Sequence, residues 1–182
     1  MTLLETARLR LRQFTSNDAN SLYALDHDPE VMRCLGSVTP PSIERIRSVV
    51  IPRFLDYHQT SCEVGFFAAE DLRSSQFIGW FHLRPIADNK PCFDSAWDDA
   101  NDLELGYRLR SERWGSGLAT EGALALVERA LNRLNIPAVS AYTLHGHKAS
   151  IRVMEKAGLE FSIQRHCSFL NAEIVKHRRV RC

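Results

Sequence analysis

Residues 103–121 read LELGYRLRSERWGSGLATE, and this stretch carries the strongest indication of the fold. Leu103–Leu109 predicts a strand, the following residues up to Gly117 predict a glycine-bearing loop, and the apolar spacing after them predicts a helix. Glycine lets backbone N–H groups approach an anion without a side chain in the way. A helix start adds unpaired N–H groups and the positive end of its dipole. The stretch therefore predicts a pyrophosphate site, unless the glycines merely join strand to helix.

Strands and helices alternate on both sides of this stretch. Strands are predicted at Thr6–Gln13, Cys62–Ala69, Phe77–Leu83 and Val139–Thr143, with a final hairpin over Phe161–Phe169 and Ala172–Val180. Helices are predicted to start at Ser16 or Asn17, at Asp28 and at Ser42, and over Lys148–Ala157, which Gly158 closes. Pro52 should kink the helix that Ser42 starts. No repeat or linker divides the chain, so we expect one α/β (α+β) domain over residues 1–182.

The composition is that of an ordinary globular protein. The 182 residues include 23 basic and 22 acidic side chains, a net charge of +1. Near-neutrality argues against a general nucleic-acid binder, and no apolar run approaches the ~20 residues of a membrane helix. The N-terminus shows no signal peptide. Five scattered cysteines without a Cys-x-x-Cys pair favour a reducing, cytoplasmic location and argue against structural zinc.

The glycine loop can be compared with known anion-binding loops. A P-loop needs a lysine that is missing here, and a dinucleotide fingerprint needs Gly or Ala where Thr120 stands. The remaining candidate is coenzyme A. The segments Glu104–Tyr107, Trp114–Glu121 and Ala149–Leu159 resemble the GNAT superfamily of N-acetyltransferases. Together with Thr6–Arg12 and Asp28–Met32, they resemble its RimJ/RimL-type branch, which acetylates the N-termini of ribosomal proteins.

The resemblance implies a mixed, mostly antiparallel, splayed sheet flanked by helices, and acetyl-CoA as cosubstrate. The pantetheine arm would enter between the strand that ends at Leu109 and the strand Val139–Thr143, and the Leu109 backbone would bond it. Cofactor-binding residues would be Leu109, Trp114, Gly115, Ser116, Gly117, Leu118, Ala119, Thr120, His147 and Ser150. Glu112 departs from the Gln or Arg of many members and does not favour phosphate. Arg110 or Arg113 could supply the missing positive charge.

The resemblance also points to catalytic groups. Glu104 is the candidate base, directly or through a water, although it could simply pair with an arginine; His82 is a second candidate or a packed core residue. Where many members place a tyrosine as general acid, this chain has Met154, which cannot donate a proton. Ser150 could protonate the thiolate or cap its helix. His147, where this branch usually has Asn, can donate one hydrogen bond. His145 and His147 lack a third ligand, so no metal site is expected.

The acceptor is less clear from the sequence. Residues 85–102 hold five Asp and one Lys, a charge of −4, which could form an acidic rim for a cationic amine or a solvated loop. Trp97 could pack on that rim or on an acceptor. Four basic residues near the C-terminus could flank the 3′-phosphate of CoA or fray in solvent: Lys176, Arg178, Arg179 and Arg181.

The favoured function is acetyl transfer from acetyl-CoA to a primary amine, either a protein N-terminal α-amine or a small amine, by direct attack in a ternary complex. The main alternative is a non-catalytic acyl-CoA-binding module or sensor, and a weaker one is a nucleotide-dependent oxidoreductase. No nucleic acid or membrane partner is expected, and a homodimer is plausible for this branch.

Overall fold

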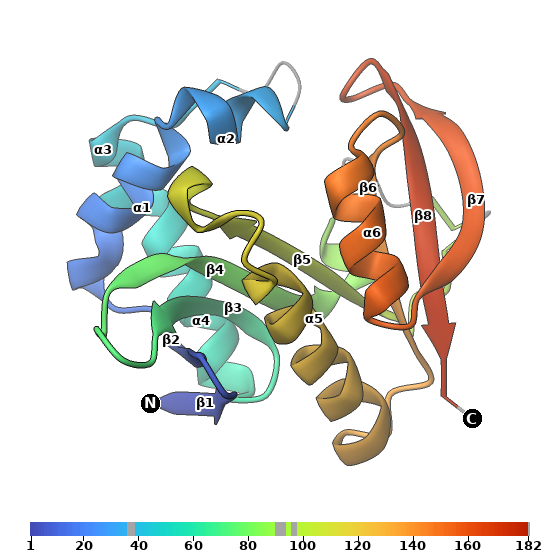
Figure 1. Cartoon of the computed structure of the whole chain (residues 1–182), viewed down its shortest axis with the longest axis horizontal. Coiled ribbons are helices and arrows are strands. Elements are labelled where there is room, and N and C mark those ends of the chain that lie inside the picture. Colours follow the sequence, from blue (N-terminus) through green and yellow to red (C-terminus); the bar gives the residue numbers. More distant parts are fainter. Residues whose placement is uncertain (36–38, 90–93, 96–97, 182) are drawn as a thin grey trace. The chain divides into compact units, whose positions relative to one another are not determined.

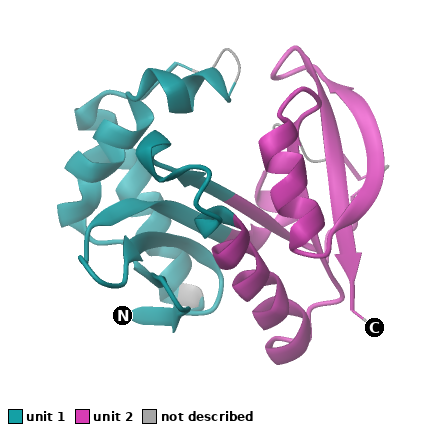
Figure 2. Ribbon diagram, in the orientation of Figure 1, with its two compact units in different colours: residues 1–82, 107–119 teal, residues 83–106, 120–182 magenta. Residues whose placement is uncertain are grey.

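A computed structural model describes residues 1–35, 39–89, 94–95 and 98–181. The chain divides into two compact units, residues 1–82 with 107–119 and residues 83–106 with 120–182 (Figure 2). The chain passes between the units within β4 (Phe77–Pro85), β5 (Leu103–Leu109) and α5 (Leu118–Glu128). Each unit is described below by itself.

Within the described residues, eight strands form one sheet in the order β1-β2-β3-β4-β5-β6-β8-β7 (Figure 1). The other strands are β1 (Thr2–Glu5), β2 (Leu9–Gln13), β3 (Gly65–Asp71), β6 (Ala138–Leu144), β7 (Glu160–Cys167) and β8 (Ala172–Val180). β5 and β6 run parallel, whereas β1–β2, β2–β3, β6–β8 and β7–β8 are antiparallel. The expected mixed, mostly antiparallel sheet with flanking helices is therefore confirmed. β1, which the sequence pattern did not indicate, extends the sheet at one edge.

The first unit carries the N-terminal helices. α1 (Ala19–Asp26) follows a short 3-10 turn over Ser16–Asp18, whose Asp18 carboxylate accepts the backbone N–H of Thr15 at 2.7 Å. The cap therefore lies at Thr15 rather than at Ser16 or Asn17. α2 (Pro29–Arg33) begins as expected, because the Asp28 side chain accepts the Glu30 N–H at 2.9 Å.

The helical segment after Ser42 continues through Pro52 and contains a wide turn just before it. Ser42 caps α3 (Ile43–Arg45), a wide turn follows over Ile46–Val50, and α4 (Ile51–Thr60) begins one residue before Pro52. The Ile51 N–H bonds to the Ile46 carbonyl, five residues back. Proline lacks a backbone N–H, but near the start of a helical turn that missing donor costs little. The helix is therefore not interrupted at Pro52, and a wide turn precedes it instead.

The core of the first unit is aromatic. Phe54 stacks on Phe66 with ring centroids 4.0 Å apart, and Phe14 lies 5.0 Å from Phe54. Leu22, Leu25 and other side chains of α1–α4 complete this cluster. Burial of such rings supplies both a large apolar area and defined ring geometry.

In the second unit, β6 pairs with β8 along its whole length, from Ala138–Val180 to Leu144–Ile174. α6 (Lys148–Lys156) packs against β6 and β7 (Figure 1). Gly158 ends it as expected: its φ is +81°, and a Cβ there would lie 3.0 Å from the Arg179 side chain.

Two further observations concern the whole described chain. No helix among the described residues is long and apolar enough to cross a membrane. Cys34, Cys62 and Cys167 are free thiols, whereas Cys92 and Cys182 lie outside the described residues.

Candidate active site

The glycine loop lies where β5 gives way to α5. A short 3-10 turn, Ser111–Arg113, follows β5, and α5 begins at Leu118. Gly115 and Gly117 have φ values of +72° and +83°, a backbone region that strains other residues. A Cβ at Gly115 would meet nothing within 4 Å, so the space beside the backbone is open. The loop therefore presents exposed backbone at the N-terminus of an 11-residue helix.

Side chains brace this loop instead of covering it. The Trp114 indole Nε1 donates to the Leu109 carbonyl at 2.8 Å, which ties the loop to the end of β5. The Ser116 hydroxyl donates to the Arg113 carbonyl at 2.6 Å. Arg8 Nη1 donates to the Ser116 carbonyl at 2.8 Å. These bonds hold the loop backbone in place.

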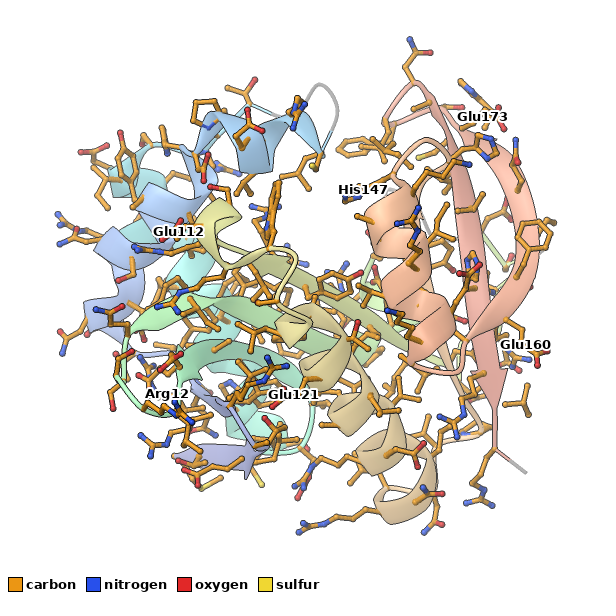
Figure 3. The ribbon with its side chains drawn as sticks, viewed as in Figure 1. Arg12, Glu112, Glu121, His147, Glu160 and Glu173 are labelled. Carbon is orange, nitrogen blue, oxygen red and sulfur yellow. The ribbon has the colours of Figure 1, made fainter. Side chains whose placement is uncertain are left out.

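The positive charge at the loop comes partly from a residue that sequence reasoning missed. Glu112 is exposed on the 3-10 turn (Figure 3), and Arg110 lies 3.4 Å from it. Arg113 reaches Asp71 at 3.6 Å. Arg8, which precedes β2, lies directly at the loop. The strand pattern of Thr6–Gln13 shows that Arg8 faces outward, but no local signal links it to a loop 108 residues away.

Glu104 is buried in the second unit and held by two side chains. Its Oε2 accepts from Arg84 Nη2 at 2.8 Å and Nε at 2.9 Å, and its Oε1 accepts from Asn89 Nδ2 at 3.0 Å. Burial raises the pKa of the Glu104 carboxyl above its ordinary value, while Arg84 and Asn89 oppose that rise. The expectation that Glu104 pairs with an arginine is confirmed. Its role as a base remains a proposal.

His82, the second candidate base, is a packed residue of the first unit. Its ring stacks on Trp80 with centroids 5.6 Å apart and meets the edge of Phe66 at 4.9 Å. The side chain is 6 % exposed. This environment is that of a packed core histidine, which was the alternative to a catalytic base.

Ser150 is not the helix cap. The N-cap of α6 is His147, and Ser150 lies in the first turn, 7 % exposed. Because α6 begins at Lys148 and its N-cap is His147, Ser150 does not occupy the N-cap position that the capping alternative gave it. His147 lies at the start of α6 (Figure 3), with Nδ1 3.3 Å from the Thr143 hydroxyl. Burial lowers the pKa of His147, which favours its neutral form. Met154 is buried in the core.

The acidic loop and the basic tail neutralise each other within the second unit. Lys176 Nζ lies 2.7 Å from Asp98, and Arg178 lies 2.7 Å from Asp102. Asp98 also accepts from the Tyr142 hydroxyl. Burial and the carboxylates around it raise the pKa of Tyr142. Asp98 and Asp102 therefore belong to buried ion pairs and not to an acidic rim or a solvated loop, whereas Asp99 is exposed and residues 90–93 and 96–97 lie outside the described residues.

The remaining basic residues near the C-terminus also contact other side chains. Arg179 lies 2.7 Å from Glu128, and Arg181 donates to Asn135 at 2.8 Å. The tail is the strand β8 and not a frayed end, because β8 pairs with both β6 and β7. Arg165 of β7 pairs with Asp94 at 2.6 Å. Trp97 lies outside the described residues.

The loop fits the pyrophosphate of coenzyme A, by its open glycine positions, its exposed backbone and the nearby Arg8. Donors of this type bind phosphate at helix starts. Among the residues that the structure describes, no group of three His, Cys, Asp or Glu side chains could hold a metal ion.

Comparison with known proteins identifies the family of the chain. Residues 8–160 match the model of the acetyltransferase (GNAT) domain. YkkB of Bacillus subtilis is 28 % identical over 165 residues, covering 88 % of this chain and 87 % of that protein. The FsC-acetyl coenzyme A-N(2)-transacetylase of Aspergillus fumigatus is 30 % identical over 158 residues, covering 86 % of this chain and 64 % of that protein.

Solved structures share the fold. RimL, a ribosomal L7/L12 α-N-protein acetyltransferase solved in complex with coenzyme A, superposes with a TM-score of 0.76 at 14 % identity. The match covers 99 % of this chain and 98 % of RimL. The chain belongs to the GNAT acetyltransferase family, whose members transfer the acetyl group of acetyl-CoA to amines. It is therefore an acetyl-CoA-dependent acetyltransferase, and it shares its fold with RimL and with a ribosomal-protein-S5-alanine acetyltransferase from Vibrio fischeri.

Proposed function

We propose that the chain acetylates a primary amine by direct attack on acetyl-CoA in a ternary complex. The observation that carries the proposal is the exposed loop Gly115–Gly117 at the start of α5, with positive φ at both glycines. The acceptor is either the α-amine of a protein N-terminus or a small amine. The coenzyme A in the RimL structure supports the cofactor half of this proposal.

The cofactor is held mainly by backbone. The N–H groups of Gly115, Ser116, Gly117, Leu118, Ala119 and Thr120 bind the pyrophosphate, and Trp114 keeps the loop in place through its bond to Leu109. The Leu109 backbone also bonds the pantetheine arm. His147 is neutral and can donate one hydrogen bond to the same arm.

In the reaction, the nitrogen lone pair attacks the thioester carbonyl carbon, the C–N bond forms and the C–S bond breaks. Glu104 takes the proton that the amine loses, directly or through one water. Ser150 donates the proton that the CoA thiolate needs, and the serine is reprotonated from solvent. A free α-amine has a pKa of about 8, so it needs little help to become neutral, whereas a lysine amine at about 10.4 needs more.

The second candidate function is a non-catalytic acyl-CoA-binding module. The buried pairing of Glu104 with Arg84 and Asn89 favours it, because both carboxylate oxygens already accept hydrogen bonds from these side chains. The burial of Met154, where many members place an acidic tyrosine, favours it as well.

Turnover separates the two functions. We expect release of the CoA thiol from acetyl-CoA in the presence of at least one amine of a panel that includes peptides with free N-termini. Glu104→Gln and Ser150→Ala should each slow this release at least tenfold, with the Kd for CoA unchanged within about threefold. Tight CoA binding without turnover of any amine would favour the binding module. An unchanged rate in either variant would remove that residue from the mechanism.

Two further proposals concern the protein as a whole. The scattered cysteines, three of which are free thiols here, support a reducing cytoplasmic location. We also propose a homodimer, which sedimentation velocity at several protein concentrations would test.

A further inference from the structure

Arg108 has hydrogen-bonding capacity that the fold does not use. On β5, its Nη1 donates to the Asp26 carboxylate at the end of α1. Its guanidinium carbon lies 5.2 Å from the centre of the Trp80 ring. Its Nε is buried, and no described residue accepts a hydrogen bond from it. A buried N–H donor without an acceptor is costly, so such a group in a family of enzymes needs an explanation.

The side of the Arg108 guanidinium that carries Nε is the one that suits a carboxylate. The N–H groups of Nε and Nη2 point the same way from the plane of a guanidinium and form a fork. This fork accepts both oxygens of a carboxylate in parallel hydrogen bonds. Asp26 holds the other nitrogen, Nη1, and Trp80 lies at cation–π distance from the guanidinium, so both neighbours fix its orientation. About a fifth of the side chain is still exposed (21 %).

The place of Arg108 in the strand connects it with the reaction. Alternate residues of a strand share a face, so Arg108 faces the same side of β5 as Gly106 and Glu104, the proposed base. It immediately precedes Leu109, the residue proposed to bond the pantetheine arm. Along β5, Arg108 therefore lies between the proposed base and the residue proposed to bond the pantetheine arm.

We propose that Arg108 is a specificity-determining residue that binds a carboxylate of the acceptor, so that the substrate is an amine that also carries a carboxylate. The inference rests on the proposed function. Polycationic amines are disfavoured because they meet a fixed guanidinium. The acidic residues that could have attracted them, Asp94, Asp98 and Asp102, are each paired with a basic side chain of β7 or β8.

The test uses acceptors that differ in one group. Phenylalanine carries the carboxylate, phenylalaninamide only a carbonyl, and phenethylamine neither; spermidine represents the polyamines. We expect kcat/KM to be at least about tenfold higher for phenylalanine than for the other three. The panel is repeated with leucine and alanine and their amides and amines, so that the outcome does not depend on one side chain.

The variants separate recognition from folding. Arg108→Met leaves Asp26 without its cation, so the double variant Arg108→Met with Asp26→Leu is measured beside it. Arg10→Met is the control; within the part of the chain that the structure describes, this cation pairs with Glu5 and Glu70. We expect both Arg108 variants to lose the preference for carboxylates while the Kd for CoA stays within about threefold of the wild type. Arg10→Met should keep the preference.

Each outcome bears on the inference. A preference that survives in the folded double variant would overturn it. Equal or better turnover of the amides would show recognition of a carbonyl, as in a peptide terminus, and would also overturn it. Turnover only of plain amines or spermidine would overturn it while leaving the proposed function intact. Turnover of no amine at all would overturn the proposed function together with this inference.

Discussion

Lys176 Nζ lies 2.7 Å from Asp98 Oδ1, and both side chains are buried, with 1 % and 0 % of their surface exposed. The pair joins the strand β8 to the segment that precedes β5. Charges buried in this way are stable only as a pair, because each of them alone would lose its hydration without compensation. The relationship therefore fixes the segment around Asp98 against the sheet of the second unit.

Breaking this pair from one side should be strongly destabilising. Lys176→Met leaves the Asp98 carboxylate buried without its cation, and we expect the free energy of unfolding to fall by about 3–5 kcal/mol. The double variant Lys176→Met with Asp98→Asn should recover part of that loss. Arg165→Gln, which breaks the half-exposed pair with Asp94, should cost at most about 1 kcal/mol. Urea unfolding measures all three, and equal losses for Lys176→Met and Arg165→Gln would contradict the prediction.

The glycine loop should be sensitive to a side chain at Gly117. Gly117→Val places a branched side chain at a φ of +83° and beside the N–H groups proposed to hold the pyrophosphate. We expect the Kd for CoA, measured by titration calorimetry, to rise at least tenfold. Glu112→Ala is the control, because Glu112 is exposed and makes none of the bonds that hold the loop backbone. Circular dichroism checks that both variants fold, and a normal Kd in folded Gly117→Val would remove the loop from the site.

The pH dependence of the reaction should reflect the protonation of the Glu104 carboxylate. Burial raises the pKa of this carboxyl and Arg84 lowers it, so removing Arg84 should raise the pKa further. A base with a higher pKa is protonated over a wider range, so activity is lost at a higher pH. We therefore expect the acid limb of kcat/KM in Arg84→Gln to move up by about one pH unit or more.

Two comparisons complete that experiment. Glu104→Gln should lose the acid limb, because the titrating group is gone. Arg10→Met, remote in sequence and paired with Glu5, should leave the limb where it is in the wild type. A limb that does not move in folded Arg84→Gln would show that Glu104 is not the base.

Acid should destabilise the protein through Asp102. Burial raises the pKa of Asp102, but hydrogen bonds from Arg178 and Ser140 outweigh burial and hold it below its ordinary value. The folded state then binds fewer protons than the unfolded state. The stabilisation is present above the ordinary pKa of about 3.9 and is lost as the pH falls through the depressed value.

Asp102→Asn tests this linkage. Its free energy of unfolding should fall less steeply than that of the wild type between about pH 4 and pH 2, as urea titrations at several pH values would show. Asp99→Asn is the control, because Asp99 is exposed and its carboxylate, among the described residues, accepts hydrogen bonds only from Asn101. Parallel curves for wild type and Asp102→Asn would contradict the assignment.

The parts of the fold that local patterns determine were predictable. β5 begins and ends where its pattern predicts, at Leu103 and Leu109, and α6 ends at Lys156, two residues before the expected Gly158 stop. These boundaries depend on strand alternation, on apolar helix spacing and on a glycine that only a positive φ explains, all of which act over a few residues. The short strand β1 was not predicted, because its four residues gain stability from pairing with β2 and not from their own pattern.

The candidate site also has a part that local sequence determines and a part that depends on the tertiary structure. The sequence by itself determined the glycine loop, the start of α5 and the family, because backbone access to an anion is set by neighbouring residues. Only the tertiary structure decided the partners of the charged side chains: Arg8 at Ser116, Arg84 at Glu104, Arg108 at Asp26 and Lys176 at Asp98. Ion pairs form between residues that are distant in the sequence, and their strength depends on burial. A count of charges along the chain therefore shows an acidic loop and a basic tail, where the folded protein contains neutral, buried pairs.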